Sequence, residues 1–252
     1  MVPSTTLRPS TTKGYPWNME CFSSTMCVME RKFNFSTDEY YHIYARGVEK
    51  RIIFVDQYDY SRFIKLLYIA NSHKPFEYKL IGGLPLEKIK REKIIVSIGA
   101  YCLMPNHFHL LIREKDESGI SKFMLKLMTA YSMYFNKKYN RTGRLFQNTF
   151  QAKHADNDEY LRYLFSYIHL NPLKLVDENW YKQNEKKLKI QREFLQNYYL
   201  SSYLDFVGIN REEKIILNKE NFPDYFSTER EFSDFINDWL EMRDMGIESI
   251  QG

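Results

Sequence analysis

The stretch from Tyr101 to Arg113, YCLMPNHFHLLIR, constrains the fold of this chain more than any other segment. After Pro105 its apolar residues alternate with His107 and His109, which is the period of two that is typical of a strand with two distinct faces. Pro105 and Asn106 indicate a turn just before this strand. Both imidazoles therefore point to the same side, where they could share one divalent cation; two histidines that only pack on a half-buried strand are the alternative.

The composition is that of a globular protein without membrane spans. The chain has 252 residues, enough for one large domain or for a domain of about 150 residues with an extension. No segment approaches the roughly 20 apolar residues of a membrane helix, and the first residues lack an apolar signal segment. Three cysteines without a Cys-x-x-Cys pair indicate a reducing compartment and no structural zinc site. We therefore expect a cytoplasmic protein that does not associate with a membrane.

The charge is unevenly distributed along the chain, although the net charge is only +4. Residues 31–175 contain 24 Lys and Arg against 14 Asp and Glu, a net charge of +10, whereas residues 176–252 contain 10 against 16, a net charge of −6. A basic middle region favours a polyanionic partner such as nucleic acid. The acidic C-terminal region either covers part of a nucleic-acid groove or serves solubility and packing, and we favour the second interpretation.

Composition and periodicity divide the chain into three parts. Residues 1–35 are rich in Ser, Thr and Pro without a sustained period, and we interpret them as a flexible leader. Residues 36–175 form the main domain, and residues 176–252 form an acidic, mostly helical extension. Within that extension, residues 226–242 have the pattern of a final amphipathic helix.

Strand and helix patterns alternate within residues 36–175 and predict an α+β fold. Asp56 is the expected N-cap of the first helix, and Asp156 or Asn157 that of the last. Strands are expected at residues 40–48, 94–98, 107–113 and 149–154, and helices at residues 57–72, 120–139 and 157–171.

Tyr167 and Asn171 lie four residues apart on the last predicted helix and therefore share a face. Pro172 pushes Asn171 away from the α region, so the helix should end there and leave the Asn side chain free to bind something. A packed tyrosine followed by an Asn-Pro stop is the alternative interpretation. Among the other tyrosines, Tyr163 and Tyr131 are reserve candidates for a nucleophile, although the helical spacing of Tyr131 indicates a core residue.

Combined, these side chains predict a site for phosphoryl transfer. Two imidazoles and the Asn171 oxygen suit Mg²⁺ or Mn²⁺ holding a substrate phosphate better than a closed zinc site. Tyr167 would attack phosphorus and form a phosphotyrosine. A phenol with a pKa of about 10 needs a base, a water or a nearby positive charge when it attacks. The sequence does not identify that base, and His169 faces elsewhere on the helix.

A second candidate surface combines cations with aromatic rings in the stretch NRTGRLFQNTFQAKH, residues 140–154. Cations can contact phosphates while bases stack on the rings, which is the chemistry of single-strand binding; an ordinary solvated loop and strand is the alternative. The predicted nucleic-acid-binding residues are Arg46, Arg113, Arg141, Arg144, Phe146, Phe150 and Lys153.

Five motifs in this chain resemble those of the single-tyrosine HUH transposases of the IS200-like type, specifically the REP-associated tyrosine transposases. They occur in order between Tyr40 and Gly208 and read PNHFHLLI, GISKFMLKLMTAYSMYFNKKY, GRLFQNTFQAKH, DEYLRYLFSYIHLNPLK and SSYLDFVG. The resemblance implies a ferredoxin-like HUH palm, a central antiparallel sheet with helices packed on one face. It also implies that His107 and His109 bind a divalent metal, that Asn171 is an extra ligand and that Tyr167 is the nucleophile.

The activity implied by the resemblance is that of a metal-dependent endonuclease and strand transferase. Such an enzyme acts on single-stranded DNA at hairpins and leaves a 5′-phosphotyrosine and a free 3′-OH. One alternative is a domesticated protein that binds hairpins without strand transfer. Another is an RNA-binding or RNA-cleaving protein, because a basic aromatic surface does not distinguish the two sugars. The sequence leaves open which hairpin is recognised and whether the protein is a monomer or a homodimer.

Overall fold

A computed structural model of the protein describes residues 34–181 and 185–241, so most of the predicted leader lies outside the described residues. The contacts of the described residues make one compact unit. The strands are β1 (Tyr40–Arg46), β2 (Val96–Met104), β3 (His107–Glu114) and β4 (Gln151–His154). The helices are α1 (Gln57–Ile69), α2 (Tyr78–Ile81), α3 (Gly119–Lys138), α4 (Asp158–Leu170), α5 (Glu185–Asn197), α6 (Tyr203–Phe206) and α7 (Glu229–Glu241), and the 3-10 turn η3 (Asn171–Leu175) follows α4.

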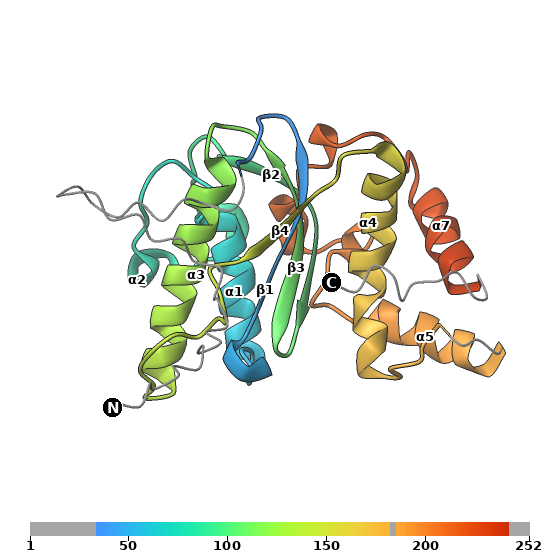
Figure 1. Ribbon diagram of the computed structural model, residues 1–252, viewed down its shortest axis with the longest axis horizontal. Coiled ribbons are helices and arrows are strands. Elements are labelled where there is room, and N and C mark those ends of the chain that lie inside the picture. The colour runs from blue at the N-terminus through green and yellow to red at the C-terminus, as the bar shows by residue number, and fades with distance from the viewer. Residues whose placement is uncertain (1–33, 182–184, 242–252) are drawn as a thin grey trace, which may run out of the picture. The chain divides into compact units, whose positions relative to one another are not determined.

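The four strands form one antiparallel sheet in the order β2-β3-β1-β4 (Figure 1). The elements follow one another as β1, α1, β2, β3, α3, β4, with the short α2 after α1, so the predicted ferredoxin-like palm is confirmed. Met104 pairs with His107, which confirms the turn at Pro105 and Asn106 as a tight hairpin loop. Because the chain reverses there, the four residues before Pro105 belong to β2 and not to the histidine strand.

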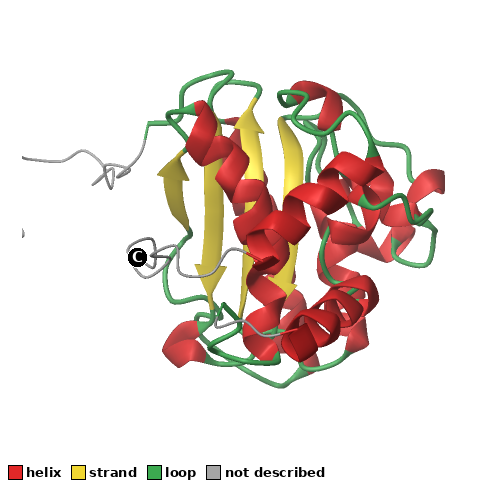
Figure 2. Ribbon diagram, turned by 90° about the vertical axis from the view of Figure 1, so that its right-hand side faces the viewer, coloured by secondary structure: helices red, strands yellow, loops and turns green. Residues whose placement is uncertain are grey.

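Helices cover both faces of the sheet, with α1 and α3 on one side and α4 on the other (Figures 1 and 2). The ring of Phe108 in β3 lies 4.8 Å from that of Phe63 in α1, whereas the ring of His109 lies 5.6 Å from that of Tyr167 in α4. The expectation that helices pack on one face only is therefore wrong. The alternation in β3 makes one face apolar and the other partly polar, but α4 shields the second face as well and leaves His109 only 5% exposed.

The ends of the helices follow capping chemistry at both predicted N-caps. The Asp56 carboxylate accepts a hydrogen bond from the Asp59 backbone, and the Asn157 side chain caps α4. The predicted end of α4 needs a correction, because Asn171 keeps the α conformation with φ −50° and ψ −39°. Pro172 has no N–H with which to continue the α pattern, so the chain tightens into η3 instead of leaving the helical region.

The C-terminal elements pack beside β2 and on α4. The Leu103 amide donates to the carbonyl of Leu200 at 2.9 Å, so this segment lies along the free edge of β2. The predicted final amphipathic helix is confirmed as α7, whose buried residues are Phe232, Ile236 and Leu240. None of the helices within the described ranges combines the length and the apolar composition needed to cross a membrane.

Candidate functional site

A cavity of about 270 Å³ opens between α4 and the face of the sheet that carries the histidines. The four residues predicted to act in chemistry all line it, namely His107, His109, Tyr167 and Asn171. Three of the predicted nucleic-acid-binding residues also line it, namely Arg46, Phe150 and Lys153. Its wall includes further side chains that the sequence did not single out, among them His42, Tyr44, Gln147, Asn148, Gln151, Tyr160 and Lys174.

The pairing register of the sheet explains why these side chains converge. Across β1 and β3, Tyr44 pairs with His109 and Arg46 pairs with His107. Residues that pair directly across antiparallel strands project to the same face of the sheet. On the other side of β1, strand β4 adds Lys153 to that face. Three strands therefore contribute polar side chains to one wall of the cavity.

The imidazole of His107 is held in one tautomer by its neighbour Asn106. The Asn106 amide nitrogen donates to the Lys50 carbonyl at 3.2 Å, so its oxygen faces His107 Nδ1, which lies 2.6 Å away. Nδ1 must therefore carry the proton, and Nε2 keeps its lone pair. Burial, followed by the charge of Arg46, lowers the pKa of His107 to about 4, so the ring is neutral at neutral pH and able to ligate a cation.

His109 contacts a third histidine, His42, which the sequence analysis missed. Nδ1 of His109 lies 2.9 Å from Nε2 of His42, and Nε2 of His109 is buried without a hydrogen-bond partner in the described structure. Burial lowers the pKa of His109 well below its ordinary value and that of His42 to about 3. Histidines that ligate a cation usually donate their other N–H to a fixed acceptor, which is the arrangement that His42 offers. Strand alternation places His42 on the same face as Arg46, so the sequence contained a signal for it.

Tyr167 extends from α4 toward this histidine group. Its ring meets those of His42 and His109 edge-on, with centroid distances of 5.5 and 5.6 Å. Burial raises the pKa of the Tyr167 phenol, while the Asn171 amide and the charge of Arg46 act in the opposite direction. The phenol is therefore protonated at neutral pH, and the groups that favour its ionised form are the Asn171 amide and the Arg46 guanidinium.

Asn171 completes the group from the end of α4. Its amide nitrogen donates to the Tyr167 carbonyl at 3.0 Å, whereas its oxygen is buried without a partner in the described structure. A buried acceptor that stays unsatisfied costs about 1–3 kcal/mol, so such an atom is a good candidate for contact with a ligand. In residues 34–181 and 185–241 no three His, Cys, Asp or Glu side chains are arranged to hold a metal ion.

Four of the seven predicted nucleic-acid contacts lie outside the cavity, and three of these four are arginines. Arg113 shares a sheet face with the histidines, but at the far end of β3, where it forms an ion pair with Asp38 at 2.8 Å. Arg141 donates to the side chain of Asn136 at 3.0 Å. Arg144 is exposed and does not line the cavity. The structure therefore concentrates only part of the predicted surface around Tyr167.

Two aromatic predictions are decided by burial. Phe146 is only 5% exposed, and its ring packs edge-on against Phe108 on the α1 and α3 side of the sheet. The predicted role of Phe146 in base stacking is wrong, because the core encloses its ring.

Tyr131 is fully buried and its hydroxyl donates to the Ile53 carbonyl, so its interpretation as a core residue is confirmed. Tyr163 lines the cavity.

Lys174 is another of the cavity residues that the sequence analysis missed. It lies in η3, and its ammonium is 5.6 Å from the centroid of the Tyr167 ring. A short 3-10 turn has no extended period, so its orientation gave no signal in the sequence.

One family model matches the part of the chain that carries most of the residues lining this cavity. Residues 86–171 match the family model of IS200-like transposases, a segment that contains His107, His109, Tyr167 and Asn171. Among solved structures, a REP-associated tyrosine transposase bound to a REP hairpin resembles the chain with a TM-score of 0.42 and 16% sequence identity, over 74% of this chain and 90% of that chain. No curated protein sequence matches the chain.

Proposed function

We propose that the protein is a metal-dependent endonuclease and strand transferase for single-stranded DNA at hairpins, and the match of residues 86–171 to the family model of IS200-like transposases supports this proposal. One observation carries the proposal: Tyr167 lies beside the neutral imidazole of His109 and the amide of Asn171, and Nε2 of His109 and Oδ1 of Asn171 are both buried without a partner in the described structure. A packed core would pair these atoms or replace them with apolar groups. Their presence beside a phenol favours phosphoryl transfer over binding alone.

The residues fit a divalent cation of the Mg²⁺ or Mn²⁺ type. His107 Nε2, His109 Nε2 and Asn171 Oδ1 would hold it. Nδ1 of His107 donates to Asn106, and Nδ1 of His109 would donate to Nε2 of His42, which would leave both Nε2 lone pairs available. When bound, the cation would polarise the scissile phosphate and stabilise the charge that builds on its oxygens. Neutral nitrogen and oxygen donors with open positions suit that role.

Tyr167 would be the nucleophile of the covalent step. Its phenolic proton passes to water, and the phenolate oxygen forms a bond to phosphorus as the bond from phosphorus to the 3′ oxygen breaks. The departing oxygen takes a proton from solvent and becomes a free 3′-OH, while the 5′ side stays on the protein as a phosphotyrosine. Attack by a 3′-OH on that phosphotyrosine restores the phosphodiester and the phenol, which is strand transfer.

The cavity wall would bind the DNA strand itself. It carries Arg46, Lys153 and Lys174, and the residues that line it include no Asp or Glu. Cations contact phosphates, and rings such as Phe150 offer faces on which unpaired bases stack. Outside the cavity, the exposed Arg144 is a proposed additional phosphate contact.

Covalent capture tests the proposal. The wild-type protein and Tyr167→Phe are incubated with Mn²⁺ and hairpin DNA that is labelled at its 3′ end, and the products are separated by denaturing electrophoresis. The label should stay on the wild-type protein and not on the variant. Retention by Tyr167→Phe would reject the nucleophile, and Tyr163→Phe would then be tested. If neither protein keeps the label but both shift the hairpin in a native gel, the protein binds hairpins without cleaving them.

A further inference from the structure

Lys174 is a cation that the cavity holds without a counter-ion. It lies just past Asn171, where the match to the transposase family ends. Within the described part of the chain, no carboxylate lies within ion-pair distance of Lys174 or of Arg46. Burial lowers the pKa of Lys174, and the neighbouring charge of Arg46 lowers it further. A half-buried ammonium in this situation gains free energy when an anion arrives.

The position of this cation identifies which anion it would meet. Its ammonium lies 5.6 Å from the centroid of the Tyr167 ring, within the range of a cation–π contact. Arg46 pairs with His107 across the sheet and lines the same cavity. By contrast, Lys153 lies 4.6 Å from the ring of Tyr160, nearer the beginning of α4. The cavity cations are therefore divided along α4, with Lys174 at the end that holds Tyr167.

We propose that Lys174, assisted by Arg46, binds the DNA phosphate that Tyr167 attacks. The inference rests on the proposed function and adds to it a catalytic residue that the family match does not include. An ammonium beside the reacting phenol can neutralise the phosphate during attack and stabilise the negative charge on the phenol oxygen. Lys153 would contact a phosphate further along the same strand.

The first test measures equilibrium binding without any chemistry. In a Tyr167→Phe background with a chelator present, binding of a short single-stranded oligothymidylate is measured over a range of KCl concentrations. Lys174→Met should weaken binding several-fold and reduce the slope of log K against log salt by about 0.7, the value for one phosphate contact on a single strand. Lys174→Arg should restore both. Lys137→Met is the matched control, because it removes one exposed charge from α3 on the opposite face of the sheet.

The second test locates the phosphate. In the same Tyr167→Phe background, each linkage around the cleavage position, mapped by covalent capture on the wild-type protein, is replaced in turn by an uncharged methylphosphonate. A methylphosphonate at the scissile linkage should weaken DNA binding by the protein that has Lys174. The same replacement should change DNA binding by Lys174→Met very little, because the cation that contacts this phosphate is already absent. With Tyr167 intact, covalent capture by Lys174→Met should be about 100-fold slower and by Lys174→Arg close to wild type, because the charge acts in the transition state.

Several results would overturn the inference. An unchanged salt slope in Lys174→Met would show that Lys174 does not hold this phosphate. The same conclusion would follow if the linkage whose neutralisation no longer weakens binding in Lys174→Met were not the scissile one. A large loss of thermal stability in Lys174→Met would indicate a structural role instead, since a cation without an ion pair should be replaceable by Met at no cost to folding. Failure of the wild-type protein to capture any DNA would reject the proposed function, and loss of the salt effect alone would reject only the role of Lys174.

Discussion

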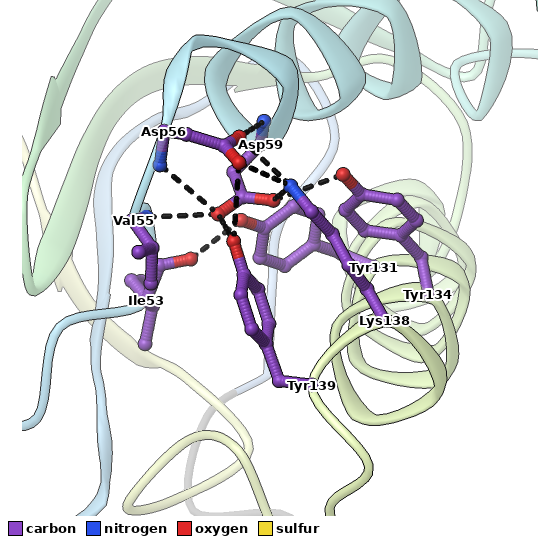
Figure 3. A network of polar contacts seen from close by, with 8 residues as sticks. All are labelled: Ile53, Val55, Asp56, Asp59, Tyr131, Tyr134, Lys138 and Tyr139. Atoms are coloured by element: carbon purple, nitrogen blue, oxygen red, sulfur yellow. Dashed lines mark hydrogen bonds and ion pairs between the residues drawn. The ribbon is translucent and has the colours of Figure 1, made fainter.

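Two polar clusters lie on opposite faces of the sheet, and they use their hydrogen-bonding groups in opposite ways. Between α1 and α3, the fully buried carboxylate of Asp59 accepts hydrogen bonds from Lys138 at 2.7 Å, Tyr134 at 2.9 Å, Tyr139 at 2.8 Å and the Val55 amide at 2.8 Å (Figure 3). Burial acts to raise the pKa of Asp59, but these donors, Lys138 first, outweigh it and hold the pKa below its ordinary value. The carboxylate is thus charged, paired and closed to ligands.

The histidine cavity on the α4 side leaves comparable groups unpaired. Nε2 of His109 and Oδ1 of Asn171 are buried without partners in the described structure, and Lys174 has no carboxylate near it. A satisfied network joins elements and stabilises the fold, whereas an unsatisfied one is completed by a ligand. The α1 and α3 side also supports the histidine cavity through Ile53. The Ile53 carbonyl accepts a hydrogen bond from the Tyr131 hydroxyl, and the Ile53 amide donates to the carbonyl of Pro105, in the turn before His107.

The largest expected effect separates activity from stability in the cavity. Tyr167→Phe should reduce covalent capture by about 1,000-fold or more, because it removes the attacking oxygen. Its free energy of unfolding should change by no more than about 0.5 kcal/mol, and hairpin affinity should be nearly intact since phosphate contacts dominate it. Urea denaturation and a native gel shift measure the two controls. A variant that loses stability along with capture would contradict the comparison.

Asp59→Ala should produce the opposite pattern. Removing a buried carboxylate that is paired with Lys138 should cost about 3–5 kcal/mol of unfolding free energy, because the ammonium and hydroxyl donors lose their acceptor. Capture per folded molecule should remain near wild type at low temperature. Asp38→Ala is the matched control, since its pair with Arg113 is exposed and worth about 0–1 kcal/mol. Equal losses in the two variants would remove the distinction between the clusters.

His42→Phe tests the pairing of His42 with His109 in the cavity. An aromatic ring remains but can no longer form the hydrogen bond with His109 Nδ1, so His109 should lose its orientation. The affinity for Mn²⁺ without DNA should fall about 10–100-fold, as is usual when the partner of a ligand histidine is removed. Tyr44→Phe, in the same wall, should leave this affinity unchanged. Unaltered Mn²⁺ binding by His42→Phe would show that His42 does not orient His109.

The smallest effect concerns a histidine of α4 that is fully paired. His169 donates from Nδ1 to the Phe165 carbonyl at 2.8 Å and accepts at Nε2 from Ser202 at 2.7 Å. Burial lowers its pKa to about 3, although the Phe165 carbonyl opposes the shift. Between about pH 3 and pH 6.5 the unfolded chain therefore binds a proton that the native protein does not, and stability falls as the pH is lowered through this window.

The measurable consequence is a slope of stability against pH. His169 should contribute up to about 1.4 kcal/mol per pH unit, which urea denaturation between about pH 5 and pH 6.5 can resolve. His169→Asn should lower the slope by that amount, and the remaining slope comes from the other buried histidines. A variant with the wild-type slope would show that His169 is charged in the native protein.

The sequence by itself determined the features that depend on local spacing. The period of two in β3 placed His107 and His109 on one face, and the spacing of four in α4 placed Tyr167 and Asn171 on one face. The antiparallel sheet, the N-caps at Asp56 and Asn157 and the course of α7 follow from equally local patterns. Such features are readable because alternation, helical period and capping act over a few neighbouring residues.

Only the tertiary structure decided which distant residues complete the cavity. The register of β1 against β3 brought His42 and Arg46 to the histidine pair, and the tight turn after α4 brought Lys174 to Tyr167. Packing enclosed Phe146, which has the same composition signal as the cavity residue Phe150. Packing also placed α4 on the face of the sheet opposite α1 and α3. Register and burial depend on contacts between residues far apart in the chain, and a local pattern contains no information about which partner a residue will meet.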